Sequence, residues 1–360
     1  MKHGIRTAIA ACIMTEAKIQ RQHLRLQINE WIISSLCLIS RPFHHLIELY
    51  ALLLQMKVMM KDNTIHNKVV TVGFFDGVHT GHRHLADRLK KEAAERGMLS
   101  QIVTFTEHPR QIIQTEFRPL LLSTPHNKLA MLEQTGIDIC TSLHFTGELA
   151  EMDARSFMQH VLYEELGAGC LLMGHDHRFG HDCITDFNAY RKIGEDIGIE
   201  VLHSDALLYK DLPVSSSRIR KCLAEGQCDE ANDMLGYIYS ISGTVVHGLQ
   251  NGRKMGFPTA NLKPYCEYLQ IPANGVYAAW ATVRGHKYKA MLNIGFRPTI
   301  NQTGTARTIE AHLLDFDCDI YDEELSLSFV SYIRPERRFD SMNSLASQLG
   351  MDREAVRNTL

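Results

Sequence analysis

Residues 69–82 read VVTVGFFDGVHTGH, and this stretch decides the fold class. The apolar run Val69–Phe75 is typical of a buried strand, Asp76-Gly77 is a turn signal, and a helix is expected from about His82. A strand, a turn and a helix in this order indicate an α/β unit. His79 and His82 are therefore expected at the mouth of that helix.

A helix mouth of this composition favours phosphate. Free N–H groups and the helix macrodipole attract anions there, Gly81 has no side chain to block the approach, and each imidazole can donate a hydrogen bond to a phosphoryl oxygen. Metal binding is the weaker alternative, because no nearby Cys pair or Glu completes a tetrahedral set with His79 and His82. The stretch predicts a nucleotide-phosphate site.

Composition sets the broad class. A chain of 360 residues is long enough for two domains. With 45% hydrophobic residues, 22% charged residues and a net charge of -3, it is typical of a globular protein without a nucleic-acid partner. The 9 cysteines form no C-x-x-C pair, which argues against a disulfide framework or a zinc ribbon and favours a cytoplasmic location.

The first 59 residues differ from the rest. They hold seven Lys/Arg and three acids, with apolar patches at Trp31–Ile39 and Leu46–Leu54. Neither patch approaches the roughly 20 apolar residues of a membrane helix, so no membrane span is expected. Met59 and Met60 stand just before the first strand, which favours a start codon assigned too far upstream. The alternative is a genuine amphipathic appendage.

From Val69 to about Gly236, short apolar runs alternate with longer amphipathic segments, which predicts a parallel sheet with helices on both faces. The first helix is expected to end at Gly97, and another to follow the capping residues Ser215–Ser217 and end at Gly226. The expected strands are Val69–Phe75, Ser100–Phe105, Asp138–Phe145, Gly169–Met173 and Ile199–His203.

After Gly236 the pattern changes to strands and turns, which predicts an antiparallel sheet or a small barrel. Arg284-Gly285 and Asn251-Gly252 are hairpin signals, and a final helix is expected from about Ser341. A domain boundary is expected near residues 236–240. The expected strands are Ser240–Val246, Gly275–Val283, Lys287–Ile294, Arg307–Leu314 and Leu325–Ile333.

Three further motifs accompany the histidine motif in the first domain. They are TFTEHPR (104–110), GHDHRFG (174–180) and VSSSRIR (214–220), and each follows an expected strand or opens a helix. The carboxyl ends of parallel strands share one sheet edge, so these motifs should converge there on a ligand. The planar guanidinium groups of Arg218 and Arg220 suit a triphosphate, and Arg220 is predicted to be the one that points inward.

The motifs GFFDGVHTGH, TFTEHP, GHDHRFG and SSSRIR together resemble the adenylyltransferase module of bacterial bifunctional riboflavin kinase/FAD synthetases. The resemblance implies a Rossmann-like nucleotidyltransferase domain over residues 60–238, in which the phosphate of FMN attacks the α-phosphorus of ATP and pyrophosphate leaves. His79 and His82 would be catalytic. The implied ATP-binding residues are Gly73, Asp76, Gly81, Ser216, Ser217 and Arg220. The implied flavin-binding residues are His108, Pro109, Asp176 and Phe179.

Three positions depart from that family pattern. Phe74 stands where the family often carries a small polar residue such as Asn, His177 stands where Phe is usual, and Ser217 replaces the common Thr. Some residues also have plain structural interpretations: His84 as a solvated helix residue, His175 and His177 as loop caps, and Phe105 and Phe179 as core residues.

The second domain carries GLQNGRKMGFPTAN at residues 248–261. Its glycines permit close approach of phosphates, and Thr259 and Asn261 offer oxygen ligands suited to Mg²⁺. In the strand TIEAHLLDFD (308–317), Glu310 shares the polar face with His312. A carboxylate there can accept the proton of an alcohol as it is phosphorylated, although on its own Glu310 fits an ordinary strand-surface acid.

That loop, followed by PANGVY, NIGFRPT, EAHLLDF and RRFDSMNSL, resembles the riboflavin kinase module of the same bifunctional enzymes. The resemblance implies an antiparallel β-barrel with a terminal helix over residues 239–360. Glu310 would be the general base on the riboflavin 5′-hydroxyl, and Arg297 would bind the flavin. The implied ATP-binding residues are Gly252, Gly256 and Thr259, and the implied Mg²⁺ ligands are Thr259 and Asn261.

The two resemblances predict a cytoplasmic enzyme that phosphorylates riboflavin to FMN and adenylylates FMN to FAD, with ATP as co-substrate and Mg²⁺ as cofactor. Its expected partners are these small molecules, with no nucleic acid and no membrane, and it is expected to be a monomer or weak homo-oligomer. One alternative is a nucleotidyltransferase for another phosphate ester. The other is a flavin-binding regulatory protein with decayed catalysis, for which Phe74 is the only hint.

Overall fold

The computed structural model describes residues 66–113, 120–175, 177–182, 184–248, 252, 255–298 and 305–360. The predictions made for residues 1–59 lie outside these residues. Contacts between Cα atoms group Ile65–Leu360 into one compact unit. Across the described residues, no helix combines the length and apolarity that a membrane crossing requires.

The first half of that unit is built on a parallel sheet of five strands in the order β3-β2-β1-β4-β5. All five expected strands are confirmed. The strands are β1 (Lys68–Val72), β2 (Leu99–Phe105), β3 (Ile139–Leu143), β4 (Ala168–Met173) and β5 (Glu200–His203). The expected end of β1 at Phe75 was wrong, because Phe75 has a left-handed φ of 55° and the chain turns there into the 3₁₀ segment η1 (Asp76–Val78).

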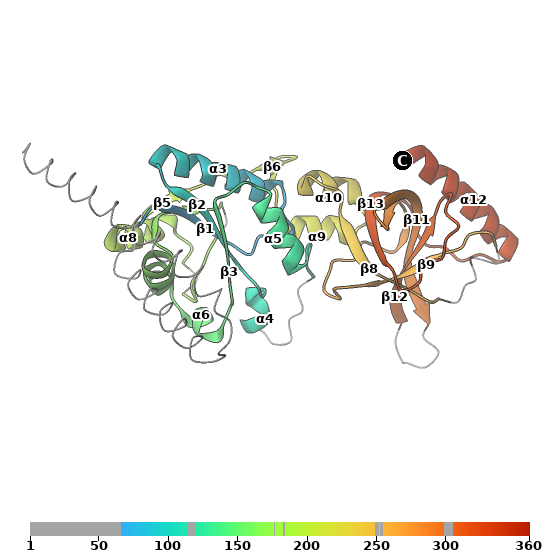
Figure 1. Cartoon of the computed structure of the whole chain (residues 1–360), viewed down its shortest axis with the longest axis horizontal. Coiled ribbons are helices and arrows are strands. Elements are labelled where there is room, and N and C mark those ends of the chain that lie inside the picture. The colour runs from blue at the N-terminus through green and yellow to red at the C-terminus, as the bar shows by residue number, and fades with distance from the viewer. Residues whose placement is uncertain are drawn as a thin grey trace, which may run out of the picture. The chain divides into compact units, whose positions relative to one another are not determined.

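Alternate residues of the strands face two separate cores. Val69 and Ile102 pack in the core that includes residues of α3 (Thr80–Arg96) and α5 (Pro125–Glu133). Their neighbours Val70 and Val103 pack with the π-helix η2 (Phe157–Glu165) and α8 (Phe187–Ile197). Figure 1 shows this sheet and its helices in blue to green. The predicted parallel sheet with helices on both faces is confirmed.

The helices begin and end at residues whose side chains or conformations cap them. α3 begins at Thr80, two residues before the expected start, because the His79 side chain accepts a hydrogen bond from the His82 amide. It ends at Gly97, which has a φ of 63° as expected of a left-handed cap. The remaining elements of this half are α4 (Pro109–Ile113), α6 (Gly147–Glu151), α7 (Ala154–Ser156), β6 (Leu208–Tyr209), β7 (Leu212–Pro213), α9 (Ser216–Ala224) and α10 (Cys228–Leu235).

The second half is a closed barrel in the strand order β10-β11-β12-β9-β8-β13, drawn in yellow to red in Figure 1. The strands are β8 (Ser240–Val246), β9 (Ala260–Pro264), β10 (Gly275–Val283), β11 (His286–Pro298), β12 (Thr305–Leu313) and β13 (Glu324–Arg334). The hairpin at Arg284-Gly285 is confirmed by the pairing of Val283 with His286. Asn251-Gly252 falls in the connection of a second antiparallel pair, because β8 and β9 are consecutive strands with Val246 opposite Asn261, but this connection spans residues 247–259 and is longer than a tight hairpin turn.

The barrel is filled by one set of side chains and covered by another. Tyr277, Leu292 and Phe329 are buried in the interior core. α12 (Met342–Thr359) begins at the predicted place, with Ser341 as its cap, and contributes Val356 to a separate cluster that includes Phe257. The outer face of the barrel that bears α12 therefore has its own small core.

Candidate functional site

A cavity of about 280 Å³ lies at the carboxyl edge of the parallel sheet. The sheet order changes direction between β1 and β4, which is where open α/β sheets bind ligands. The cavity is lined by the segments that follow β1, β4 and β5 and by the start of α9. The lining residues used below are His79, Gly81, His82, Gly174, His175, Ser215, Ser216 and Ser217. Three of the four predicted motifs therefore meet in one cavity.

The two histidines of the first motif stack on each other, with ring centroids 3.6 Å apart. Nδ1 of His79 accepts the His82 amide at 3.3 Å, so a neutral His79 carries its proton on Nε2. Burial, and then the charge of Arg220, lowers the pKa of His79 to about 3. Burial also holds the pKa of His82 well below its usual value. At neutral pH both rings are neutral hydrogen-bond donors.

The turn before the histidines is anchored by the carboxylate of Asp76, which is 4% exposed. It accepts the Leu122 amide at 2.9 and 3.0 Å and the Ser123 amide at 3.2 Å, and it pairs with Arg220 at 2.8 Å. Burial raises the pKa of Asp76, and the Leu122 amide and Arg220 oppose that rise. All of these neighbours are donors, so the geometry requires the ionised carboxylate. Asp76 holds the loop and Arg220 together.

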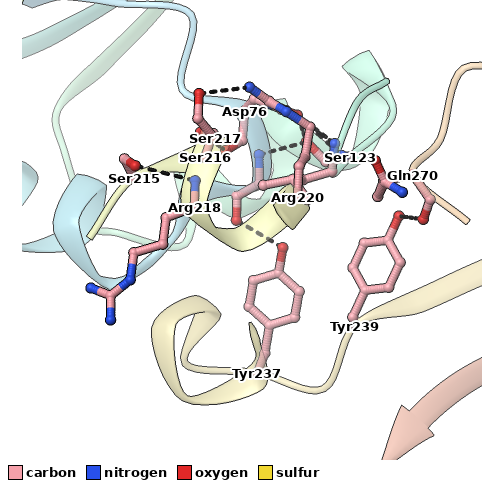
Figure 2. A network of polar contacts seen from close by, with 12 residues as sticks. Asp76, Ser123, Ser215, Ser216, Ser217, Arg218, Arg220, Tyr237, Tyr239 and Gln270 are labelled. Carbon is pink, nitrogen blue, oxygen red and sulfur yellow. Dashed lines mark hydrogen bonds and ion pairs between the residues drawn. The ribbon is translucent and has the colours of Figure 1, made fainter. Parts of the chain in front are cut away.

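The serines and arginines at the start of α9 make different contacts (Figure 2). The Ser216 hydroxyl donates to the Asp76 carbonyl at 3.0 Å, and Arg220 donates to Ser217 Oγ at 3.3 Å. Arg218 instead donates to the carbonyls of Tyr209 and Leu212. Of the two arginines, Arg220 lies near His79, where the sequence placed it.

The predicted flavin residue His108 lies against Phe74, with ring centroids 4.7 Å apart. Pro109 begins α4 directly after it. Burial, and then the charge of Arg220, lowers the pKa of His108 to about 4. Arg220 is close enough to both His79 and His108 for its charge to lower the pKa of each.

Lys128 is a residue of this region that the sequence did not reveal. It is 2% exposed, its Nζ lies 3.9 Å from the centroid of the Phe74 ring, and it donates to the Phe105 carbonyl at 2.7 Å. Burial lowers the pKa of Lys128 to about 8, against the opposing effect of Asp76. Nothing in α5, where Lys128 lies, signalled a site. The departure at Phe74 thus places an aromatic face under a buried cation.

Phe179 is half-buried and packs against the core near Tyr190, whose hydroxyl donates to the Phe179 carbonyl at 2.8 Å. The ring centroids of His177 and Phe179 lie 5.7 Å apart.

Phe105 is a core residue at 7% exposure, and His84 is exposed. Asp176 lies outside the described residues. Gly73 donates its amide to the Val103 carbonyl at 3.0 Å and so extends the pairing of β1 with β2 by one residue.

A second cavity, of about 390 Å³, lies between the barrel and α12. Glu310 and His312 both line it, as their shared strand face predicted, whereas Ile309 and Ala311 pack in the barrel interior. Thr259 also lines this cavity, and its hydroxyl lies 3.4 Å from a Glu310 carboxylate oxygen.

Asn261 lies beside Glu310 because β9 and β12 pair in that register. Its Oδ1 is buried and has no hydrogen-bond partner among the residues that the structure describes, so this oxygen is available as a metal ligand. Among the described residues no three His, Cys, Asp or Glu side chains are grouped as a metal site. A Mg²⁺ ion held by Asn261 and Thr259 would therefore need phosphate oxygens to complete its coordination, which is how this ion commonly binds.

A third cavity, of about 430 Å³, shares Thr259 with the second one and continues toward the segment 316–321. Three glycines of the predicted phosphate loop are described: a Cβ on Gly248 would lie 2.2 Å from Nδ2 of Asn261, a Cβ on Gly252 would lie 2.2 Å from the Phe257 carbonyl oxygen, and Gly256 has a φ of 76°. The Arg297 backbone continues β11, and its side chain lies outside the described residues.

Known proteins resemble the chain in both halves. A family model described as FAD synthetase matches residues 61–218, and one described as riboflavin kinase matches residues 235–360. The "Bifunctional riboflavin kinase/FMN adenylyltransferase" of Buchnera aphidicola subsp. Schizaphis graminum is 33% identical over 81% of this chain and 93% of its own. That of Listeria monocytogenes is 34% identical over 81% and 92%.

A solved structure from Streptococcus pneumoniae, of a protein named as a macrolide-efflux protein, shares the fold. Its TM-score is 0.72 and its sequence identity 30%, and the match covers 81% of this chain and 94% of that one.

Proposed function

Because the chain belongs to the family of bifunctional riboflavin kinases/FMN adenylyltransferases, we propose that its two cavities carry the two reactions separately. The cavity at the sheet edge binds ATP and FMN and forms FAD with release of pyrophosphate. The cavity between the barrel and α12 binds ATP and riboflavin and forms FMN. The observation that carries this proposal is that three of the four motifs of the first module line one cavity and the motifs of the second module line another.

For adenylyl transfer, the stacked rings of His79 and His82 donate hydrogen bonds to the phosphate oxygens of ATP. Both rings are neutral before ATP binds, so no counter-anion has to leave them when the phosphates arrive. Gly81 lets the phosphates approach, since it lines the cavity beside both rings. The Ser217 hydroxyl and Arg220 contact the remaining oxygens, while Asp76 holds Arg220 in place. The Ser216 hydroxyl joins them by exchanging its hydrogen bond to the Asp76 carbonyl for one to a phosphate oxygen. Positioning and fixed dipoles then supply most of the catalysis.

The FMN substrate in this proposal lies on the His108 side of Arg220. His108, Pro109 and Phe179 border the flavin, and Asp176 completes the predicted flavin set of this domain, whereas Gly73 belongs to the predicted ATP site. Lys128 adds a positive charge near Asp76 and Phe74 that suits the phosphate of FMN. The phosphate oxygen of FMN attacks the α-phosphorus, and pyrophosphate leaves toward the helix mouth of α3.

For phosphorylation, Glu310 accepts the proton of the riboflavin 5′-hydroxyl as that oxygen attacks the γ-phosphorus of ATP. Thr259 and Asn261 hold Mg²⁺, whose charge offsets the charge that develops on the phosphates. The loop glycines Gly252 and Gly256 fold over the phosphates, and Arg297 contacts the flavin.

We also propose that residues 60–238 and 239–360 are the two catalytic domains, and that residues 1–59 contribute to neither reaction. The enzyme acts in the cytoplasm on small molecules, without nucleic-acid or membrane partners, as a monomer or weak homo-oligomer. The free thiols of the described cysteines support a reducing compartment.

Chromatography of flavins after incubation with ATP and Mg²⁺ tests the activities. Riboflavin should be converted to FMN and then to FAD, and FMN supplied alone should be converted to FAD. Formation of FMN without FAD would contradict the adenylyltransferase, and the absence of any product from folded protein would contradict both activities. A shortened chain that starts at Met60 should give the same products at the same rates.

A further inference from the structure

The loop that carries the histidine motif has an unusual backbone. Phe75 and Val78 have φ values of 55° and 37°, and Gly77 between them has a φ of 74°. Side chains other than glycine rarely adopt such values, so the loop keeps this shape only while its surroundings hold it. Since His79 follows directly, whatever holds Gly77 also sets the position of the catalytic rings.

Both polar groups of the Gly77 peptide are held by side chains from distant segments. The Ser123 hydroxyl accepts the Gly77 amide at 3.0 Å. The Tyr237 hydroxyl donates to the Gly77 carbonyl at 2.7 Å, across 160 residues of sequence. Figure 2 shows Tyr237 reaching this loop from the segment after α10, beside Tyr239. Burial raises the pKa of Tyr237, so its hydroxyl stays protonated and remains a donor.

The segment 234–237 holds the start of α3 by further contacts. Thr80 donates its hydroxyl to the Met234 carbonyl at 2.7 Å. A Cβ on Gly236 would lie 2.9 Å from the Thr80 side chain, so the Gly236 backbone packs directly against that side chain. The Arg83 guanidinium lies 5.5 Å from the centroid of the Tyr237 ring. The segment that leads from α10 to β8 thus packs against the motif that carries both histidines.

We propose that Tyr237 is a positioning residue for adenylyl transfer, holding the Gly77 carbonyl so that His79 and His82 face the phosphates of ATP. It touches no substrate and acts through the loop. The inference rests on the proposed adenylyltransferase activity. It adds that the segment leading into the kinase barrel holds the catalytic loop of the transferase in place. A transferase cut at residue 218, where its family model ends, would lack this support.

Tyr239 provides a matched control two residues away. It is fully buried, and its hydroxyl donates to the Gln270 carbonyl at 2.8 Å, away from the histidine loop. Tyr237→Phe and Tyr239→Phe each remove one hydroxyl and one hydrogen bond from the same segment. Only the first removes a contact to Gly77.

The test measures both reactions of the full chain for the two variants. Tyr237→Phe should lower kcat for FMN adenylylation about tenfold, the effect of one net hydrogen bond, with a smaller change in KM for ATP. The reverse reaction, from FAD and pyrophosphate, should fall by a similar factor. Riboflavin kinase activity and the melting temperature should stay close to those of the unmodified chain, and Tyr239→Phe should keep its adenylylation kcat within about twofold.

Ser123→Ala adds a readout that separates positioning from general stability. Ser123 and Tyr237 hold the same peptide, so the double variant should lose less than the product of the two single losses. Unchanged adenylylation in Tyr237→Phe would overturn the inference while leaving the proposed function intact. Equal losses of both reactions in Tyr237→Phe and Tyr239→Phe would also overturn it. If the unmodified chain forms no FAD from FMN, the proposed function fails with it.

Discussion

Asp76→Asn tests the anchor of the transferase site with almost no change of shape. Both carboxylate oxygens face donors: the amides of Leu122 and Ser123 and the guanidinium of Arg220. An asparagine must turn its NH₂ toward at least one of these donors, whichever way it is oriented. The substitution therefore removes an ion pair and also places two donors face to face.

The magnitude follows from burial. A hydrogen bond to a charged group contributes about 1.5–3 kcal/mol, and an opposed buried donor costs a further 1–3 kcal/mol. The Arg220 side chain is 26% exposed and can recover part of this loss from water. A net local cost of about 2–4 kcal/mol remains, which corresponds to an opening equilibrium constant of the loop about 30- to 1,000-fold larger.

Amide hydrogen exchange of the peptide that contains Leu122 and Ser123 measures this opening directly. Adenylylation of FMN should fall at least tenfold, because Arg220 loses the partner that fixes it, whereas riboflavin kinase activity should be retained. Asp138→Asn is the control: Asp138 accepts the Ser100 amide at 2.9 Å and the Ser100 hydroxyl at 2.6 Å. The reasoning is refuted if Asp76→Asn exchanges and reacts like the control.

The site makes three further predictions. Because the pKa values of His79 and His82 lie below 6.5 in the folded chain, the unfolded chain binds more protons than the folded chain between about pH 3 and 6.5. Stability to urea should therefore fall as the pH drops below 6.5, by up to about 1.4 kcal/mol per pH unit for each ring. The rate of adenylylation should show no step near pH 6.5. The rate of adenylylation should decline above about pH 8 as Lys128 loses its proton. Lys128→Met should lower kcat/KM for adenylylation at least tenfold at pH 7 and should abolish that decline. If the decline persists in the variant, another group causes it. Asn261→Ala should raise the Mg²⁺ concentration for half-maximal kinase rate about tenfold and leave adenylylation unchanged, and an unchanged Mg²⁺ titration would remove Asn261 from the metal site.

The sheet was predictable because its strands bury both faces and therefore appear as short runs of Val, Ile and Leu. β9 was missed for the opposite reason. Its residues Ala260–Pro264 include a buried Asn, an exposed Lys and a Pro, so nothing local favours a strand. It is a strand because β8 and β12 pair with it on either side and close the barrel. That pairing is a property of the whole barrel and has no local signal.

The site was predictable where one motif carries it and hidden where distant segments complete it. His79, Gly81 and Ser215–Ser217 lie in compact motifs, and they line one cavity. Ser123, Lys128 and Tyr237 lie in segments with ordinary composition, and they reach the site only because α5 and the segment after α10 pack against the loop. Asp76, which is predicted to contact ATP, accepts the amides of Leu122 and Ser123 and pairs with Arg220, contacts that its motif did not predict.

The central claim is that one chain carries two independent sites, and mixing two inactive variants tests it most directly. With riboflavin, ATP and Mg²⁺, His82→Ala should accumulate FMN and form no FAD, and Glu310→Gln should form neither product but convert supplied FMN to FAD. An equimolar mixture of the two should form FAD from riboflavin, because FMN released by one variant is the substrate of the other. If the mixture forms no FAD, or if either folded variant loses both reactions, the two sites are not independent and the account is wrong.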